Sequence, residues 1–188
     1  MSKRAEDIAR TVQQATTAKA LPPLESWHPE LSGDMDLTIT RDGQWLYQGA
    51  PIAREATVKL FSTIMRREED GEYYLVTPVE KWRIKVEDAP LLAHSLEARG
   101  HGEDQVLSVT TNVGESLEIG TEHPLEVGHY PGNDEPRPVI LVRHGLEARL
   151  VTAAFYDLAE RVVERDVQGE AQLGVLSHGK FWKIGQGG

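Results

Sequence analysis

The stretch from Asp34 to Pro90 constrains the fold most, because two hairpin patterns enclose a helical pattern there. Short runs alternate between apolar and polar residues, and Asp42-Gly43 separates the first two, which is typical of a β-hairpin. Between the hairpins, apolar residues recur at helical spacing. Antiparallel hairpins with one helix indicate an α+β fold rather than a doubly wound parallel sheet. The predicted elements are strands at 36–40 and 44–48, a helix at 53–66, and strands at 73–77 and 80–86.

The flanking sequence predicts further elements on both sides of this stretch. Apolar residues near the N-terminus predict a short helix, and three prolines exclude a regular helix from Ala20 to Gly33. Trp27 in that segment is predicted to pack on the core. Downstream, the patterns predict helices at 89–96 and 146–164, strands at 105–111, 115–119 and 138–143, a loop with at most one short strand at 123–138, and a closing hairpin at 172–184.

The sequence also predicts an internal repeat with a spacing of about a hundred residues. Residues 70–84 align with 170–184 without a gap, and a turn with a predicted helix precedes each segment. One hairpin and one helix cannot bury both of their faces, but two such units can cover each other. We therefore expect two strand-strand-helix-hairpin repeats with antiparallel sheets packed against each other. The expected parts are an N-terminal helix or tail at 1–22 and α+β subdomains at 23–90 and 91–188.

Several runs of the sequence resemble the bacterial domain-of-unknown-function family 1285. They are the run from Asp42 to Pro90, TTNVGESLEIGTEHPL at 110–125 and VRHGLEARLVTAAFYDLAE at 142–160. The similarity covers about Leu21 to Ile184, and VTPVEK and VEDAP are its most specific stretches. It weakens over the first twenty residues and across 129–136. The resemblance implies two α+β subdomains with a repeated motif, and it implies no particular reaction.

Composition excludes several classes of function. The net charge of −10 repels nucleic acid and anionic membranes, which argues against a general nucleic-acid-binding protein. The chain has no cysteine, so it can form neither disulfides nor zinc–thiolate sites. No apolar run is long enough for a signal peptide or a membrane span. We therefore expect a soluble cytoplasmic protein that does not associate with membranes.

The first candidate binding site combines a basic strand face with the start of a helix. Lys81 follows Glu80 on the strand at 80–86, and Arg54 opens the helix at 53–66. A helix N-terminus presents unpaired N–H groups that suit an anion. Arg54, Glu80 and Lys81 are therefore candidate ligand-binding residues. The alternative is a solvated strand face whose cations are balanced by neighbouring acids.

The second candidate site lies where a predicted strand turns into a predicted helix. Arg143, Gly145 and Glu147 fall within RHGLEARL, and such junctions expose backbone donors that often hold ligands. The alternative is a structural ion pair between Arg143 and Glu147 that fixes the turn.

Motifs for metal, cofactor or nucleotide chemistry do not occur in the sequence. The seven histidines do not form an H-E-x-x-H pattern, and no P-loop, G-x-G-x-x-G or G-x-S-x-G motif occurs. We therefore predict no metal, no cofactor and no catalytic residues.

These observations favour a binding, regulatory or signalling module over an enzyme. The predicted ligand is small and anionic, held between the two units by Arg54, Lys81, Arg143 and Glu147. One alternative is a metal-independent hydrolase whose acids and histidines line the same groove. A second is a protein–protein adaptor that uses an exposed strand edge. The sequence also leaves a homodimer open.

Overall fold

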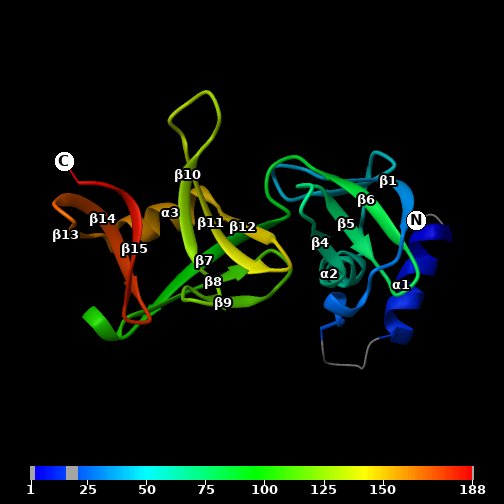
Figure 1. Ribbon diagram of the computed structural model, residues 1–188, viewed down its shortest axis with the longest axis horizontal. Helices are drawn as coiled ribbons and strands as arrows, with labels where there is room; N and C mark the ends of the chain where they lie inside the picture. The colour runs from blue at the N-terminus through cyan, green and yellow to red at the C-terminus, as the bar shows by residue number, and fades with distance from the viewer. Residues whose placement is uncertain (1–2, 16–20, 188) are drawn as a thin grey trace. The chain divides into compact units, whose positions relative to one another are not determined.

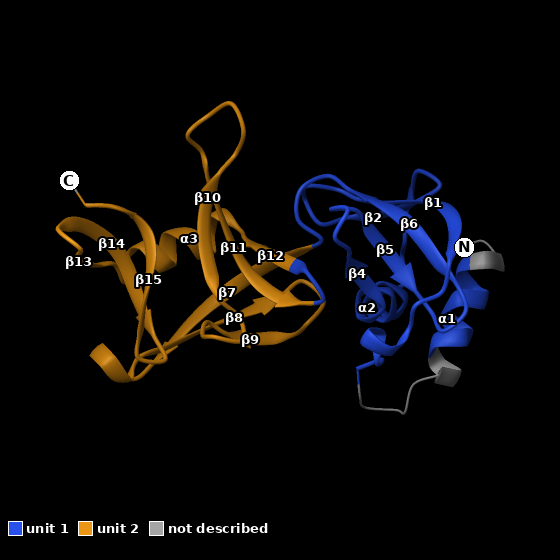
Figure 2. Cartoon of the chain, in the orientation of Figure 1, with its two compact units in different colours: residues 1–90, 144–146 blue, residues 91–143, 147–188 orange. Residues whose placement is uncertain are grey.

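The computed structural model describes residues 3–15 and 21–187, drawn as a ribbon in Figure 1. The chain divides into two compact units. Unit 1 comprises residues 1–90 and 144–146, and unit 2 comprises residues 91–143 and 147–188 (Figure 2). No helix within the described ranges is long and apolar enough to cross a membrane.

Unit 1 contains a six-stranded sheet in which β1 and β6 lie side by side at the centre. These two strands run parallel, and every other neighbouring pair runs antiparallel. The hairpins predicted at 36–48 and 73–86 are therefore confirmed. The order along the sheet is β3 (Ala50–Pro51), β2 (Trp45–Tyr47), β1 (Leu31–Ile39), β6 (Lys81–Val86), β5 (Tyr73–Val76) and β4 (Met65–Arg67).

Two α-helices accompany this sheet in the described part of unit 1. The first, α1 (Lys3–Ala15), buries its apolar stripe and contacts the second, α2 (Glu55–Thr63). Both predicted helices are thus confirmed. The second is shorter than the predicted 53–66, because Met65 already pairs with Leu75 in the sheet.

Over residues 21–30, where the structure describes it, the proline-rich segment before β1 forms no regular α-helix, as predicted. It contains a single 3₁₀ turn, η1 (Leu24–Ser26). Leu24 is fully buried and Trp27 is 8% exposed, so the segment packs on the core through these two side chains.

Unit 2 contains a second six-stranded sheet, with β7 and β12 at its centre. These two strands run parallel, and Ala148 pairs with Leu91. A 3₁₀ turn, η2 (Gly102–Asp104), precedes β8. The order along the sheet is β10 (Leu125–His129), β11 (Pro136–Arg143), β12 (Leu146–Leu150), β7 (Leu91–Arg99), β8 (Val106–Thr111) and β9 (Ser116–Glu118).

The two six-stranded sheets share one strand order. In each, two sets of three consecutive strands meet at a central parallel pair. The predicted α+β class with two similar subfolds is therefore confirmed. The repeat has a different register from the predicted one, because residues 70–84 contain β5 and β6 of the first sheet, whereas 170–184 lie in a separate small sheet. The similarity of those two segments reflects two hairpins, not equivalent positions in the repeat.

The separate small sheet belongs to unit 2 and comprises β13 (Val163–Val167), β14 (Glu170–Ser177) and β15 (Lys180–Gln186). All its strands run antiparallel, so the predicted closing hairpin is confirmed. Ser177 is fully buried at the end of β14. Its hydroxyl donates to the Ile119 carbonyl oxygen over 2.6 Å and accepts from the Leu107 amide over 3.0 Å. These bonds fasten the hairpin to the six-stranded sheet of the same unit.

Two predicted helices in unit 2 are wrong. Residues 89–96 form most of β7, and the predicted helix at 146–164 comprises β12, the short helix α3 (Thr152–Ala159) and β13. Residues in β12 alternate between buried and half-buried, and residues 148–150 of β12 pair with β7. Sheet pairing therefore overrides the helical spacing of the apolar residues. The loop predicted at 123–138 contains β10 and the start of β11.

Candidate functional site

A charged pocket opens in unit 1 between the end of β4 and the start of β6. Register across the sheet places Arg66 beside Tyr74 and Tyr74 beside Arg83. Residues paired across neighbouring strands point to the same face of a sheet, so these three side chains share one face. On that face the Arg83 Nε donates to the Asp34 carboxylate over 2.6 Å. This hydrogen bond lowers the pKa of Asp34.

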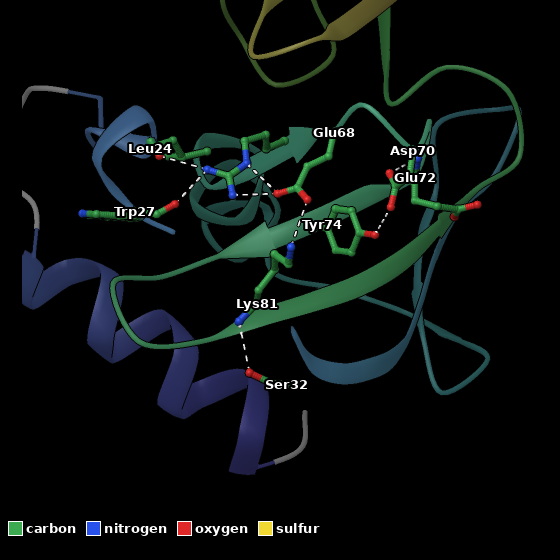
Figure 3. Close-up of polar contacts among 9 residues, drawn as sticks. Leu24, Trp27, Ser32, Glu68, Asp70, Glu72, Tyr74 and Lys81 are labelled. Atoms are coloured by element: carbon green, nitrogen blue, oxygen red, sulfur yellow. Dashed lines mark hydrogen bonds and ion pairs between the residues drawn. The ribbon is translucent and has the colours of Figure 1, made fainter. Parts of the chain in front are cut away.

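Arg66 joins this face to the segment that covers it. Its Nη1 donates to the carbonyl oxygens of Leu24 and Trp27 over 3.0 and 2.9 Å. Its Nε and Nη2 donate to Glu68 Oε2 over 3.1 and 2.7 Å (Figure 3). The side chain is only 13% exposed. Arg66 therefore has a structural role and presents its carboxylate partner at the pocket.

Glu68 lies between two cations. Its Oε1 accepts a hydrogen bond from Lys81 Nζ over 2.9 Å, while Oε2 faces Arg66. Burial acts to raise the pKa of Glu68, but the hydrogen bonds from Lys81 and Arg66 outweigh it and hold this pKa below its ordinary value. Lys81 Nζ also lies 4.7 Å from the ring centroid of Tyr74, which adds a cation–π contact.

Asp70 and Tyr74 form a second carboxylate contact beside Glu68. The Tyr74 hydroxyl donates to Asp70, which also accepts from the Glu72 amide over 2.9 Å. The hydrogen bond from Tyr74 and the one from the Glu72 amide lower the pKa of Asp70. The hydrogen bond to Asp70, aided by burial, raises the pKa of Tyr74 to about 12. Both groups therefore keep their ordinary charge states at neutral pH.

The charged pocket has a volume of about 710 Å³. Four separate stretches of the sequence line it, and all of them belong to unit 1. Its lining contains three cationic and four acidic side chains and two histidines, so the pocket suits a polar, charged ligand better than an apolar one. The titratable side chains in its lining are Arg66, Arg67, Lys81, Glu25, Glu68, Glu69, Asp70, His28 and His144.

Two of the predicted site segments meet at this pocket. Lys81 lines it directly. Gly145 packs against Arg67, because a Cβ atom at this position would lie 3.1 Å from the Arg67 Cβ and carbonyl oxygen. The amide of Arg67 donates to the His144 carbonyl oxygen over 3.0 Å. The turn at 144–145 is therefore fastened to the strand that carries Arg66 and Arg67.

Arg54 and Glu80 lie elsewhere in unit 1. Arg54 is exposed at the N-cap of α2 and lines a different pocket of about 530 Å³, beside Tyr47 and Gln48. Glu80 lies in the turn between β5 and β6, where its backbone exchanges hydrogen bonds with Thr77. Neither residue lines the charged pocket.

Arg143 and Glu147 lie in unit 2, where each has an ionic partner of its own. Arg143 Nη1 lies 2.5 Å from Glu115 Oε2, and Glu147 Oε2 lies 3.0 Å from Arg137 Nη1. These ion pairs are mostly buried, with exposed fractions of 13–29%. That Arg143, Glu147, Arg54 and Lys81 hold one ligand stays a prediction.

The sequence analysis missed the residues that do most to shape the charged pocket. Arg66, Arg67 and Glu68 fall within RREED, which follows a predicted helix and precedes a turn. The only available signal was a run of charges beside a buried strand, and solvated turns show the same signal. His28 also lines the pocket, and no sequence motif around it predicts a site.

A second polar pocket of about 430 Å³ lies in unit 2. His178 Nε2 lies 3.0 Å from Glu118 Oε1, and His123 Nδ1 lies 3.0 Å from the Leu141 carbonyl oxygen. The hydrogen bond with His178 lowers the pKa of Glu118. Within residues 3–15 and 21–187, no group of three His, Cys, Asp or Glu side chains could hold a metal ion.

Comparison with known proteins identifies the family. The model for the N-terminal domain of DUF1285, a domain of unknown function, matches residues 22–89, and the model for its C-terminal domain matches residues 90–184. The chain belongs to the DUF1285 family. The boundary between the two DUF1285 models at 89/90 lies one residue from the step from unit 1 to unit 2 at 90/91.

Two solved DUF1285 structures resemble this chain. A DUF1285 protein from Silicibacter pomeroyi DSS-3 is 40% identical with a TM-score of 0.86, over 99% of this chain and 97% of that one. A DUF1285 protein from Shewanella baltica OS155 is 29% identical with a TM-score of 0.52, over 67% of this chain and 91% of that one. Curated proteins include no match to the chain. The two structures support the fold described above.

Proposed function

We propose that this DUF1285 protein is a binding module without catalytic activity, and that unit 1 holds a small anionic ligand in the charged pocket. The observation that carries the proposal is the arrangement of Arg66, Arg67 and Lys81 around one pocket of about 710 Å³. Four acidic side chains also line the pocket, and the guanidinium and ammonium groups of these three residues are the donors in it that suit a carboxylate or phosphate group.

Arg67 is the most exposed of the three cations that line the pocket. Its side chain is exposed and its guanidinium carbon lies 5.3 Å from the ring centroid of Tyr73, which holds the planar group in one orientation. Its Nε donates to the Gly71 carbonyl oxygen over 3.3 Å. The Nη1 and Nη2 groups make no hydrogen bond to any described residue, so they can donate to a bound anion.

The pKa directions favour binding over acid–base catalysis. General acids and bases work best when their pKa lies near the working pH. Hydrogen bonds lower the pKa of Asp70 in the pocket, and those from Lys81 and Arg66 lower that of Glu68, so both carboxylates stay ionised at neutral pH. A hydrolase would need one such group raised toward neutrality. A binding protein needs only fixed charges, and it could serve a regulatory or signalling role.

The proposal is tested by titrating the protein with inorganic phosphate, acetate and citrate while recording backbone amide shifts. We expect saturable shifts at Arg67, Lys81 and His144. Arg67→Ala should weaken binding at least tenfold. Arg161→Ala, which removes an exposed arginine of unit 2 outside the pocket, should leave the affinity unchanged. Absence of shifts around the pocket with all three anions at millimolar concentration would overturn the proposal.

A further inference from the structure

We infer that Glu68 occupies, within the protein itself, the position where the ligand's anionic group binds, and that this group is a carboxylate. The inference rests on the binding function proposed above and adds the chemical class of the ligand and the residue that competes with it. The Glu68 carboxylate accepts hydrogen bonds from Arg66 Nε, Arg66 Nη2 and Lys81 Nζ over 3.1, 2.7 and 2.9 Å (Figure 3).

The donors around Glu68 are held in place by groups other than Glu68. Arg66 Nη1 donates to the carbonyl oxygens of Leu24 and Trp27, so the guanidinium has a second attachment. The Lys81 amide donates to Ser32 Oγ over 3.1 Å, and its Nζ lies over the Tyr74 ring. Both cations therefore keep their positions if the Glu68 carboxylate leaves. A site whose donors are already positioned binds a ligand without the cost of ordering them.

Glu68 itself can leave by side-chain rotation alone. Its backbone is fixed in a turn, because its amide donates to Glu72 O over 3.0 Å and its carbonyl accepts from Gly71 N over 2.9 Å. The side chain is 25% exposed, so it can rotate into solvent. Arg66 and Lys81 are then left only 13% and 18% exposed without a carboxylate, and a ligand's anionic group restores their pairing. The rest of the pocket then provides room for the body of the ligand.

The arrangement of donors matches a carboxylate. One oxygen of Glu68 faces the two N–H groups of Arg66, and the other faces Lys81. A ligand carboxylate has the same planar pair of oxygens and reproduces all three bonds. A tetrahedral phosphate lacks this planar geometry, so we expect it to bind more weakly at the same site.

Glu68→Asp tests the inference without changing the net charge. The shorter side chain cannot hold Arg66 and Lys81 at once, so acetate should bind this variant about tenfold more tightly than the wild type at constant ionic strength. The affinity for phosphate should increase by a smaller factor. Glu69→Asp is the matched control, because Glu69 also lines the pocket and no ion pair joins it to a described residue. Its affinity for acetate should equal that of the wild type.

Glu68→Ala provides a second measurement that does not depend on the aspartate variant. Acetate should raise its melting temperature by more than it raises that of Glu69→Ala. Equal acetate affinities of Glu68→Asp and Glu69→Asp would overturn the inference. If acetate still changes the amide chemical shifts at the wild-type pocket, the proposed function remains supported. If the affinity of Glu68→Asp for phosphate increased as much as its affinity for acetate, the assignment of the ligand group as a carboxylate would be overturned. If neither anion shifts pocket amides in any variant, the inference and the proposed function both fall.

Discussion

The guanidinium of Arg66 donates a hydrogen bond to the Trp27 carbonyl oxygen over 2.9 Å and joins two segments 39 residues apart. The same nitrogen donates to the Leu24 carbonyl oxygen. Residues 21–30, the described part of the segment before β1, contain no regular secondary structure apart from a 3₁₀ turn. The Leu24 carbonyl oxygen already accepts from the Trp27 amide in that turn, and Arg66 adds a second donor to it and one to the Trp27 carbonyl oxygen. One side chain thus positions both the covering segment and the carboxylate in the charged pocket.

Arg66→Ala should destabilise unit 1 strongly. The substitution leaves Glu68 without one cation and removes the Arg66 donor from the Leu24 and Trp27 carbonyl groups, of which Leu24 keeps the Trp27 amide as a donor. Breaking a largely buried ion pair costs about 3 kcal/mol. Urea unfolding monitored by tryptophan fluorescence measures the change. Arg10→Ala is the control, because that side chain is 67% exposed. Its loss should cost less than about 0.5 kcal/mol, as expected for an exposed pair. Equal effects of the two substitutions would contradict the structural role of Arg66.

Tyr74 should be among the last tyrosines to ionise. Its pKa is raised to about 12 by the hydrogen bond to Asp70 and by burial. Since the folded-state pKa exceeds the unfolded value, the stabilisation is fully present below about pH 10 and is lost as the pH rises through the folded value. Alkaline titration of tyrosinate absorbance should show a late component that Tyr74→Phe removes.

The hairpins could be predicted from the sequence, but the helices predicted at 89–96 and 146–164 were wrong. Asp42-Gly43 forms a turn whose glycine has a φ of 85°. Turns of this kind are determined by residues that are neighbours in the sequence, so the sequence predicts them. The error at 146–164 has a different origin. Apolar residues recur there at helical spacing, yet the pairing of Ala148 with Leu91 decides the structure of the first part. Such a partner, far away in the sequence, gives no local signal.

The candidate site was predictable only at Lys81 and the turn around Gly145. Lys81 stood out because it lies on a basic strand face, and Gly145 because it follows a strand. Arg66 and Glu68 could not be recognised, since their roles depend on the sheet register that brings β4 and β6 to the two edges of β5. Charged side chains in a turn are usually solvated, and only the three-dimensional arrangement shows that Arg66 and Glu68 are largely buried and paired.

Ser177→Ala should loosen the small sheet from the rest of unit 2. The substitution leaves the Leu107 amide and the Ile119 carbonyl group buried without their hydroxyl partner. An unsatisfied buried polar group costs about 1–3 kcal/mol. Hydrogen exchange should therefore accelerate at the Leu107 amide, and the unfolding free energy should fall by about 2 kcal/mol. Ser116→Ala, at an exposed position, is the control and should change neither quantity. Unchanged exchange at Leu107 would show that the hydroxyl is dispensable.

Gly145→Ala should disturb both the turn and the charged pocket. Gly145 has a φ of 76°, a conformation that costs alanine about 1 kcal/mol. A methyl group there would also lie 3.1 Å from the Cβ and carbonyl oxygen of Arg67. We expect a lower melting temperature and a several-fold weaker affinity for acetate, because Arg67 has to shift. Gly169→Ala is the matched control, since it has a φ of 86° and nothing within 4 Å of the new methyl group. It should lower the melting temperature without changing the affinity, and equal loss of affinity in both variants would contradict a contact between the turn and the pocket.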